Sequence, residues 1–247
     1  MDLRNYMDST YLKTAVQAGV SEEENSKIVQ QVIKEAVEES FKLVMLRPQY
    51  VAQARAYIDL SESKVLVGTV IDFPGGKGSL NEKLEEAQRA IDAGADELDF
   101  VVNYRLFQQG MIEEVRDQIC KCTQLTLGAG KTVKWIIEVA ALSNMEIVQL
   151  TTLIKKVALS KFEEKQYDKI FVKSSTGFFQ TEDGRPNGAT VEALVLMLEN
   201  ANPLPVKAAG GIRNRQDAEL MIGLGVKRLG TSSAKAIVDN LDSDNTY

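Results

Sequence analysis

Three lysines interrupt apolar stretches of this 247-residue chain, at positions where a charge is costly. Lys134, Lys173 and Lys207 each lie in a short run rich in Val, Ile or Ala, and a lysine is rarely buried without a partner. Burial or a cationic neighbour lowers the pKa of an amine, and a neutral amine attacks carbonyl carbons. The three lysines therefore predict amine nucleophiles or, alternatively, buried ion pairs with strand carboxylates such as Asp99 and Glu138.

Residues that suit an anion follow three of the later apolar runs. They are the clusters 174–177 (SSTG), 210–211 (GG) and 230–233 (GTSS). Glycine lets backbone N–H groups approach an anion, and a helix N-terminus adds a favourable dipole. Any one cluster is equally well explained as a simple turn, but three together indicate a site for a phosphate-sized anion.

The sequence contains no histidine, and this absence limits the catalytic mechanisms that the protein could use. Ser-His-Asp and Cys-His catalysis and His-rich zinc sites are excluded, so an enzyme here must use other side chains or borrow a cofactor. The formal charge is −6, from 29 basic and 35 acidic residues. This acidic balance disfavours a nucleic-acid partner but is compatible with a local basic pocket for a small anion.

The cysteines and the first residues of the chain are informative about the cellular location of the protein. Cys120 and Cys122 lie in a predicted helix, where side chains two residues apart point about 200° apart and are not expected to bond each other. We interpret them as reduced thiols of a cytoplasmic protein. The first residues lack the apolar core of a signal peptide, and no stretch approaches ~18 uninterrupted apolar residues, so no membrane span is expected.

Short β-branched runs alternate with longer amphipathic ones along the chain. The predicted strands are 4–7, 41–46, 64–71, 97–102, 133–139, 169–173, 204–208 and 227–230. Three Ser-x-x-Glu capping boxes predict helix starts, at Ser21 with Glu24, Ser79 with Glu82 and Ser143 with Glu146. Pro48 and Asn214 are expected to begin two further helices, and Gly223 and Gly225 to end the second of them.

The spacing of these elements predicts the fold class. Strand centres recur every ~24–36 residues, the period of a β-α unit, and the strands read as the continuous apolar runs of parallel strands. Eight such units in this length predict an α/β (β/α)8 TIM barrel, a single domain over 1–247 with 239–247 as a tail. A doubly wound open sheet is the alternative, but no Gly-rich turn follows the first strand. The irregular stretch 178–188 is expected to be a working or mobile loop.

Asp99 is the carboxylate best placed to serve the lysines. Alternation along a strand puts it on the face of Glu97 and Val101, opposite Leu98 and Phe100. If that face is inward, Asp99 is expected to orient a lysine or pass protons. A structural ion-pair role is an equally good interpretation.

Several strings together resemble one family. FVKSSTGF, PVKAAGGIR, RLGTSSA, AGADELDFVVNYR and VIDFPGG are similar to those of the deoxyribose-phosphate aldolases, class I Schiff-base aldolases on a (β/α)8 barrel. The resemblance runs in order from about residue 7 to about residue 236. It implies reversible cleavage of 2-deoxy-D-ribose 5-phosphate to acetaldehyde and D-glyceraldehyde 3-phosphate, without metal or cofactor. It also implies sugar-phosphate and small-aldehyde partners, and a homodimer or higher homo-oligomer is compatible with it.

The resemblance also implies roles for individual residues. Lys173 resembles the imine-forming lysine, Lys207 the second lysine whose charge keeps the first pKa low, and Asp99 the aspartate of a proton relay. The implied substrate-binding positions are Thr10, Gly177, Gly210, Gly211, Gly230, Ser232 and Ser233. In some relatives a terminal tyrosine reaches the active site, which would assign that role to Tyr247.

The sequence departs from the family pattern near the expected mouth of the barrel. Ser9 stands where many members have histidine, Met45 where cysteine is usual, and Arg47 where an uncharged residue is usual. Arg47 adds a cation that would suit another anionic group or lie solvated at the rim. The segments 160–167 and 180–187 look longer than in many relatives. These departures leave two alternatives open: an aldolase for another phosphorylated sugar, and a non-catalytic phosphate-binding barrel.

Overall fold

The computed structural model describes residues 1–182 and 184–241, and a closed ring of eight parallel strands lies at the centre of this part of the chain. The strands are β1 (Met7–Tyr11), β2 (Leu43–Leu46), β3 (Leu66–Ile71), β4 (Glu97–Val101), β5 (Thr132–Ile136), β6 (Ile170–Lys173), β7 (Val206–Ala209) and β8 (Arg228–Thr231). Each strand pairs with the next, and β8 pairs with β1 to close the ring. The predicted (β/α)8 barrel is confirmed, and the open sheet is excluded.

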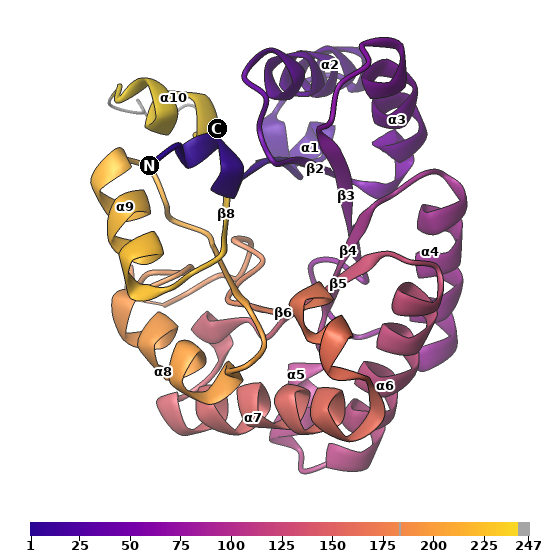
Figure 1. The fold of residues 1–247 in the computed structure, drawn as a ribbon, viewed down its shortest axis with the longest axis vertical. Helices are drawn as coiled ribbons and strands as arrows, with labels where there is room; N and C mark the ends of the chain where they lie inside the picture. The colour runs from indigo at the N-terminus through magenta and orange to yellow at the C-terminus, as the bar shows by residue number, and fades with distance from the viewer. Residues whose placement is uncertain (183, 242–247) are drawn as a thin grey trace.

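Helices surround the ring on its outside (Figure 1). They are α1 (Ala15–Ala18), α2 (Glu22–Glu38), α3 (Val51–Leu60), α4 (Leu80–Asp92), α5 (Tyr104–Gln108), α6 (Ile112–Gly128), α7 (Asn144–Lys161), α8 (Val191–Ala201), α9 (Arg215–Leu224) and α10 (Ala234–Asp239). Four 3-10 helices are η1 (Leu3–Tyr6), η2 (Pro48–Tyr50), η3 (Val139–Ala141) and η4 (Glu164–Lys169). Within the described ranges, none of the helices combines the length and the apolar character that a membrane crossing needs.

The helix starts follow the local sequence signals. All three Ser-x-x-Glu boxes form reciprocal caps at the starts of α2, α4 and α7. Pro48 begins η2, which runs into α3, and the Asn214 side chain caps α9. These predictions are confirmed because a cap is decided by neighbouring residues alone.

Three boundary predictions were wrong. Residues 4–7 do not form the first strand, because Leu3–Tyr6 make η1 and β1 begins at Met7. The polar side chains of this strand hid it from a search for apolar runs. The fifth strand stops at Ile136, and Glu138 beyond it has a left-handed backbone with φ of 60°. Gly223 lies inside α9, whose last residue is Leu224 and whose C-cap is the predicted Gly225.

The two faces of each strand bury different kinds of side chain. On β4, Leu98 and Phe100 belong to the main apolar core, and Phe100 stacks on Trp135 with ring centroids 5.0 Å apart. Asp99 and Glu97 are buried on the opposite face, where they meet side chains from other strands. The predicted alternation about Asp99 is confirmed.

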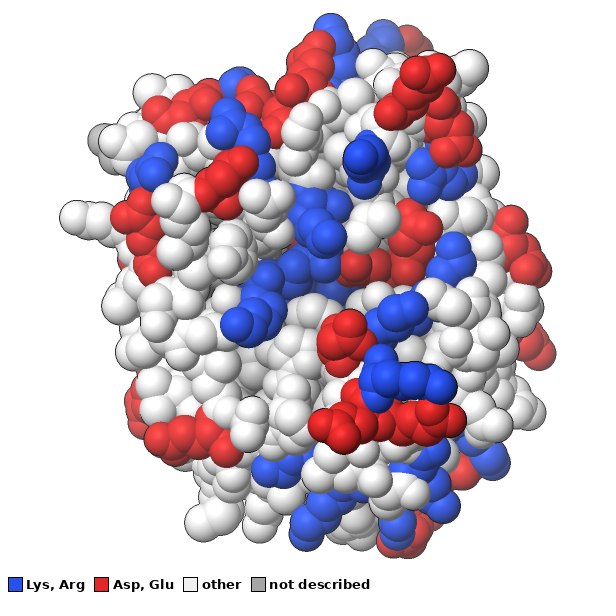
Figure 2. Space-filling model, viewed as in Figure 1, with Lys and Arg blue, Asp and Glu red and all other residues white. Residues whose placement is uncertain are grey.

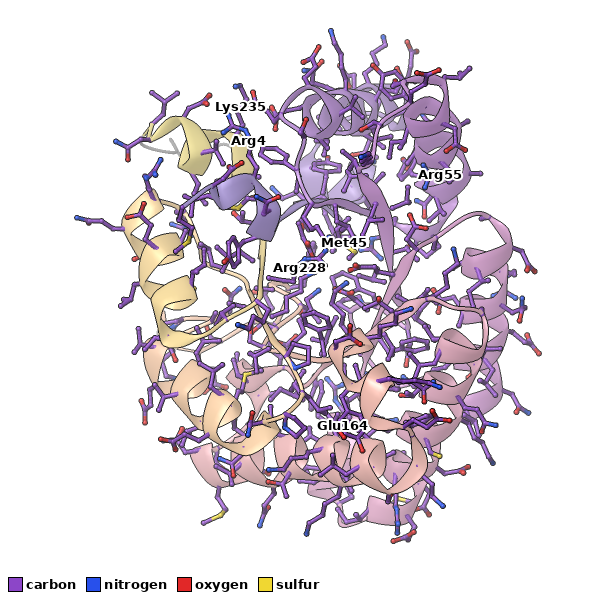
Figure 3. The ribbon with its side chains drawn as sticks, in the orientation of Figure 1. Arg4, Met45, Arg55, Glu164, Arg228 and Lys235 are labelled. Carbon is purple, nitrogen blue, oxygen red and sulfur yellow. The ribbon has the colours of Figure 1, made fainter. Side chains whose placement is uncertain are left out.

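The barrel interior has two halves of different chemistry. The charged half is supplied by β1 and β4–β8 and consists of Asp8, Glu97, Asp99, Lys134, Lys173, Lys207 and Arg228. The apolar half is a separate buried cluster of Leu12, Leu43, Met45 and Val70. Arg228 and Met45, one from each half, are labelled near the centre of the ring in Figure 3.

The face of the barrel seen in the figures is the one at which the strands begin. η1, which precedes β1, lies toward the viewer in Figure 1, and α1, which follows β1, lies behind. Basic side chains gather near the middle of this face in Figure 2, and single lysines directly precede four strands, at Lys42, Lys131, Lys169 and Lys227. The residues that end the strands lie on the far face.

Candidate active site

Asp99 lies at the centre of the charged half. Its Oδ2 accepts hydrogen bonds from Lys173 Nζ at 2.8 Å and from Lys207 Nζ at 2.9 Å, and its Oδ1 accepts one from Lys134 Nζ at 2.7 Å. All four side chains are buried. The three lysines that stand out in the sequence therefore converge on one carboxylate, and two of them share a single oxygen.

A closed ring of alternating charges surrounds this point. In order, its members are Lys134, Asp99, Lys207, Asp8, Arg228 and Glu97. Neighbouring nitrogen and oxygen atoms in this ion-pair ring are 2.5–3.0 Å apart. Three cations balance three anions, so Lys173, which bonds only to Asp99 among the ring members, is the excess cation of the cluster.

The charges in this cluster set the pKa values of its members. Burial favours the neutral form of Asp99, but Lys134, Lys173 and Lys207 outweigh it and hold the pKa of Asp99 well below its usual value. Burial also lowers the pKa of Lys134, yet the carboxylates of Asp99 and Glu97 prevail and raise it.

Lys173 behaves differently from Lys134. Burial lowers its pKa most strongly, Asp99 opposes this effect, and Lys207 and Lys134 lower it further, to about 8. The predicted depression of the Lys173 pKa by Lys207 is present, but desolvation contributes more. A neutral amine is therefore accessible to Lys173 near neutral pH, which a nucleophile toward carbonyl carbon requires.

Lys173 opens into a cavity of about 860 Å³. The predicted substrate-binding residues all line the same cavity: Thr10, Gly177, Gly210, Gly211, Gly230, Ser232 and Ser233. Asp99, to which Lys173 and Lys207 both donate, and Lys207 itself do not line the cavity. The nucleophile candidate and the anion-site candidates thus share one space, with the charged half below it.

The glycines let two loops approach closely in this cavity. Gly177, Gly210 and Gly211 have positive φ values of 80°, 85° and 78°, which side-chain-bearing residues rarely adopt. A Cβ atom on Gly188 would collide with the carbonyl of Gly210. The loop after β6 therefore packs against the loop after β7, and any larger residue at either position would separate them.

Some parts of this arrangement were not predicted from the sequence. Asp8 forms an ion pair with Lys207, but the predicted first strand, 4–7, left Asp8 out. The one signal in the sequence was its position two residues before Thr10. Gly188 belongs to the irregular stretch 178–188, which was expected to be a working or mobile loop without any residue being singled out. Its contact with Gly210 joins sites far apart in the chain, so no local pattern reveals it.

Of the three residues that depart from the family pattern, only Met45 lies in the apolar half. Met45 is fully buried in that cluster, and Ser9 is buried in β1. Arg47 donates from Nε to the backbone oxygen of Leu12 at 2.7 Å, and its guanidinium lies 4.9 Å from the ring centre of Phe73. Arg47 is half-buried and is not among the residues that line the cavity.

Other predictions concern the ends and loops. Part of 160–167 forms the end of α7 and the start of η4. Residue 183 of the segment 180–187 lies outside the described part of the chain, as do residues 242–247, including Tyr247. Cys120 and Cys122 are not bonded to each other, as expected.

Comparison with known proteins identifies relatives over the full length. No protein-family model matches the chain. Deoxyribose-phosphate aldolases of Staphylococcus haemolyticus and Staphylococcus carnosus are each 36% identical to it, over all of both chains. A tetrameric deoxyribose phosphate aldolase from Aeropyrum pernix superposes with a TM-score of 0.78 at 29% identity, covering 96% of this chain and 89% of that one. The chain belongs to the deoxyribose-phosphate aldolase family.

Proposed function

We propose that this protein is a class I aldolase that reversibly cleaves 2-deoxy-D-ribose 5-phosphate to acetaldehyde and D-glyceraldehyde 3-phosphate. The observation that carries this function is the position of Lys173, the excess cation of a charge-balanced cluster, at the floor of the cavity. Full-length relatives that bear the name of this activity support the choice of substrate. The alternatives of another sugar phosphate and of a non-catalytic barrel have no comparable support.

The reaction begins with the neutral amine of Lys173. Its nitrogen forms a bond to the aldehyde carbon C1 of the sugar, and loss of water from the resulting carbinolamine leaves an iminium. The C2–C3 bond then breaks, and its electron pair moves into the iminium to give a neutral enamine. The C3 hydroxyl loses its proton and becomes the aldehyde of glyceraldehyde 3-phosphate.

The second half of the reaction releases acetaldehyde. Carbon C2 of the enamine takes up a proton, which regenerates an iminium, and water hydrolyses this to acetaldehyde and free Lys173. Asp99 and Lys207 lie within hydrogen-bond distance of the amine or of each other. We assign them the proton transfers, with Lys207 also disfavouring a charge on Lys173.

The phosphate group is assigned to the glycine and serine loops of the cavity. Gly210 and Gly211 follow β7, and Ser232 and Ser233 follow β8. The loops after the seventh and eighth strands are the usual phosphate-binding positions of this fold. With the phosphate there, C1 would extend toward Lys173 on β6.

The oligomeric state, cellular location and partners of the enzyme are inferred from less direct observations. We propose a homo-oligomer in the cytoplasm, supported by the tetrameric relative and by two free cysteines. A net charge of −6 supports small-molecule rather than nucleic-acid partners. Light scattering on the purified protein measures the oligomeric state, and a monomer at all concentrations would contradict the first of these inferences.

The test of the function traps the imine. The protein is incubated with acetaldehyde, reduced with borohydride and digested, and peptide masses are searched for a two-carbon adduct. We expect the adduct on Lys173, and its loss in Lys173→Ala. Lys83, which is equally buried but lies on α4 and pairs with Asp72, is the internal control and is expected to stay unmodified.

A second assay separates the alternative functions. Release of glyceraldehyde 3-phosphate from deoxyribose 5-phosphate is followed by a coupled enzyme and compared with other sugar phosphates. Labelling without cleavage of deoxyribose 5-phosphate would indicate an aldolase for another sugar. An unlabelled protein would favour the non-catalytic barrel.

A further inference from the structure

Glu138 has a backbone conformation that is unusual for glutamate. It follows β5 with φ of 60° and ψ of 68°, a left-handed conformation that favours Gly, Asn or Asp over a residue such as Glu. Its side chain is only 1% exposed, although a carboxylate is costly to bury. The position is strained and desolvated, and both properties are concentrated at functional sites.

The carboxylate of Glu138 is engaged by one residue of the turn after β6. It accepts a hydrogen bond from the hydroxyl group of Thr176 and lies 3.3–3.4 Å from the Thr176 backbone nitrogen, which also donates to it. The Thr176 hydroxyl oxygen in turn accepts a hydrogen bond from the backbone N–H of Phe178 at 3.0 Å. Glu138 therefore ties the loop after β5 to the turn that begins at Lys173.

These bonds decide which way the Thr176 hydroxyl faces. A threonine hydroxyl has one proton to donate and two lone pairs to accept with. The proton is committed to Glu138 and one lone pair to Phe178, and Thr176 lines the cavity together with Lys173 and Gly177. One lone pair remains, so the turn presents a hydrogen-bond acceptor to the cavity.

We propose that Glu138 is a positioning residue that, through Thr176, makes this turn accept a hydrogen bond from a hydroxyl group of the sugar. The inference rests on the proposed function and deepens it. It predicts that hydroxyl-bearing substrates depend on Glu138, whereas acetaldehyde, which has no hydroxyl group, does not.

The groups around Glu138 also connect this role to pH. Lys173 of β6 and Tyr104 of α5 are the titratable groups that interact with it in the described part of the chain. Burial raises the pKa of Glu138 to about 6, against the hydrogen bonds of Thr176 and the charge of Lys173. Below that pH the protonated carboxyl group would donate to Thr176, whose own proton would then turn toward the cavity, and the acceptor would be lost.

The experiment compares two reactions in Glu138→Gln, Thr176→Val and Thr176→Ser. For Glu138→Gln and Thr176→Val we expect kcat/KM for deoxyribose 5-phosphate to fall by about 10- to 100-fold. The rate of borohydride trapping with acetaldehyde should stay within about twofold, because that reaction needs only the amine. Thr176→Ser keeps the hydroxyl group and should retain most of the cleavage activity. Equal losses in both reactions would overturn the inference, because they would mean that Glu138 only supports the fold.

The pH profile gives a readout that a purely structural residue would not change. In the wild type, log kcat/KM should fall with a slope of one below about pH 8, where Lys173 takes up its proton, and a slope of two below about pH 6, where Glu138 does so as well. The substrate phosphate takes up a proton near the same pH in every variant, so the readout is the difference between the profiles. Below about pH 6 the slope of Glu138→Gln should be one unit shallower than that of the wild type. Equal slopes in this variant and in the wild type would contradict the inference.

Controls separate this inference from the proposed function. Glu86→Gln removes a partly buried carboxylate that likewise accepts a backbone N–H, that of Asp72 at 2.8 Å, and should keep the wild-type slopes. If Glu138→Gln does not fold by circular dichroism, Thr176→Val carries the test. A wild type without labelling or cleavage would refute the proposed function, whereas an active wild type matched by Thr176→Val would refute only the role of Glu138.

Discussion

The charged and apolar halves of the barrel interior lie side by side and are equally well buried, but they serve different ends. The apolar half, with Leu43, Met45 and Val70 at its centre, is ordinary core and stabilises the fold by excluding water. The charged half contributes little net stability, because desolvation of buried ions offsets most of their attraction.

What the charged half does provide is control over one proton. Six of its charges form a balanced ring, and a proton on Lys173 adds an uncompensated positive charge to the interior. Losing that proton makes the cluster neutral, which agrees with a pKa of Lys173 lowered to about 8, whereas that of Lys134 is raised. The ring thus keeps one amine reactive, whereas the neighbouring apolar cluster only fills space.

Removing the reactive amine should give the largest effect on activity. Lys173→Ala is expected to lower kcat at least ~10⁴-fold, because no other nucleophile opens into the cavity from the charged half. The measurement is the coupled cleavage assay, with Lys173→Arg as a variant that keeps the positive charge. Activity within tenfold of wild type in either variant would remove Lys173 from the mechanism.

Changing the charge balance of the ring should give the next largest effect. Lys207→Leu removes a cation that lowers the pKa of Lys173, so that pKa should rise above about 8 and a smaller fraction of the amine is neutral at pH 7. We expect a fold intact by circular dichroism and a loss of ~10²–10³-fold at this pH, partly recovered at higher pH.

The control for this variant is Lys207→Arg, which keeps the charge. Its pH midpoint should stay closer to that of the wild type. If Lys207→Leu shows a near-normal rate or an unchanged midpoint, Lys207 has no part in tuning the amine.

A charge added at the rim, above the charged half, should affect only one class of substrate. Ser233→Asp places a carboxylate where the phosphate is proposed to bind, and like charges repel strongly in a confined site. KM for deoxyribose 5-phosphate should rise ~10- to 100-fold, while borohydride trapping with acetaldehyde is unchanged. Ser233→Asn, similar in size but neutral, is the matched control, and equal losses for both reactions would place the phosphate elsewhere.

The smallest effect on activity is expected in the apolar half. Met45→Ala leaves a cavity in that cluster and should lower the free energy of unfolding by ~2–4 kcal/mol. The kcat of the folded enzyme should change less than about fivefold, because no charge of the ring is altered. Urea unfolding measures the free energy of unfolding, and the coupled assay measures kcat. Met45→Leu, which nearly conserves volume, should change neither quantity appreciably. A large loss of kcat would mean that the two halves are not separable.

The parts of the site that could be predicted are those that short strings carry. Lys173 and Lys207 stand out because a charge interrupts an apolar run, and Asp99 because strand alternation fixes the face on which it lies. The glycines of the cavity cluster directly after strands, and the capping boxes act within four residues. Each of these signals is local, so it survives without knowledge of the partner.

The parts that escaped prediction depend on contacts between distant strands. Asp8 and Arg228 are 220 residues apart, and Gly188 matters only because Gly210 approaches it. Glu138 was recognised as a candidate partner of a lysine, but it bonds to Thr176, because the chain turns into a left-handed conformation after β5. The strand that carries Asp8 was misplaced because its polar residues do not produce an apolar pattern.

The order of residues alone thus determined the barrel, the family and the lysines on which the chemistry is proposed to depend, since periodicity, caps and motif strings are properties of neighbouring positions. Tertiary structure alone decided what sets the amine of Lys173 apart from the other two buried lysines. Closing the barrel brings charges from six strands together, and their balance leaves Lys173 as the one amine without a full share of compensating carboxylate. This charge balance depends on the distances between residues from different strands, so no single stretch of sequence reveals it.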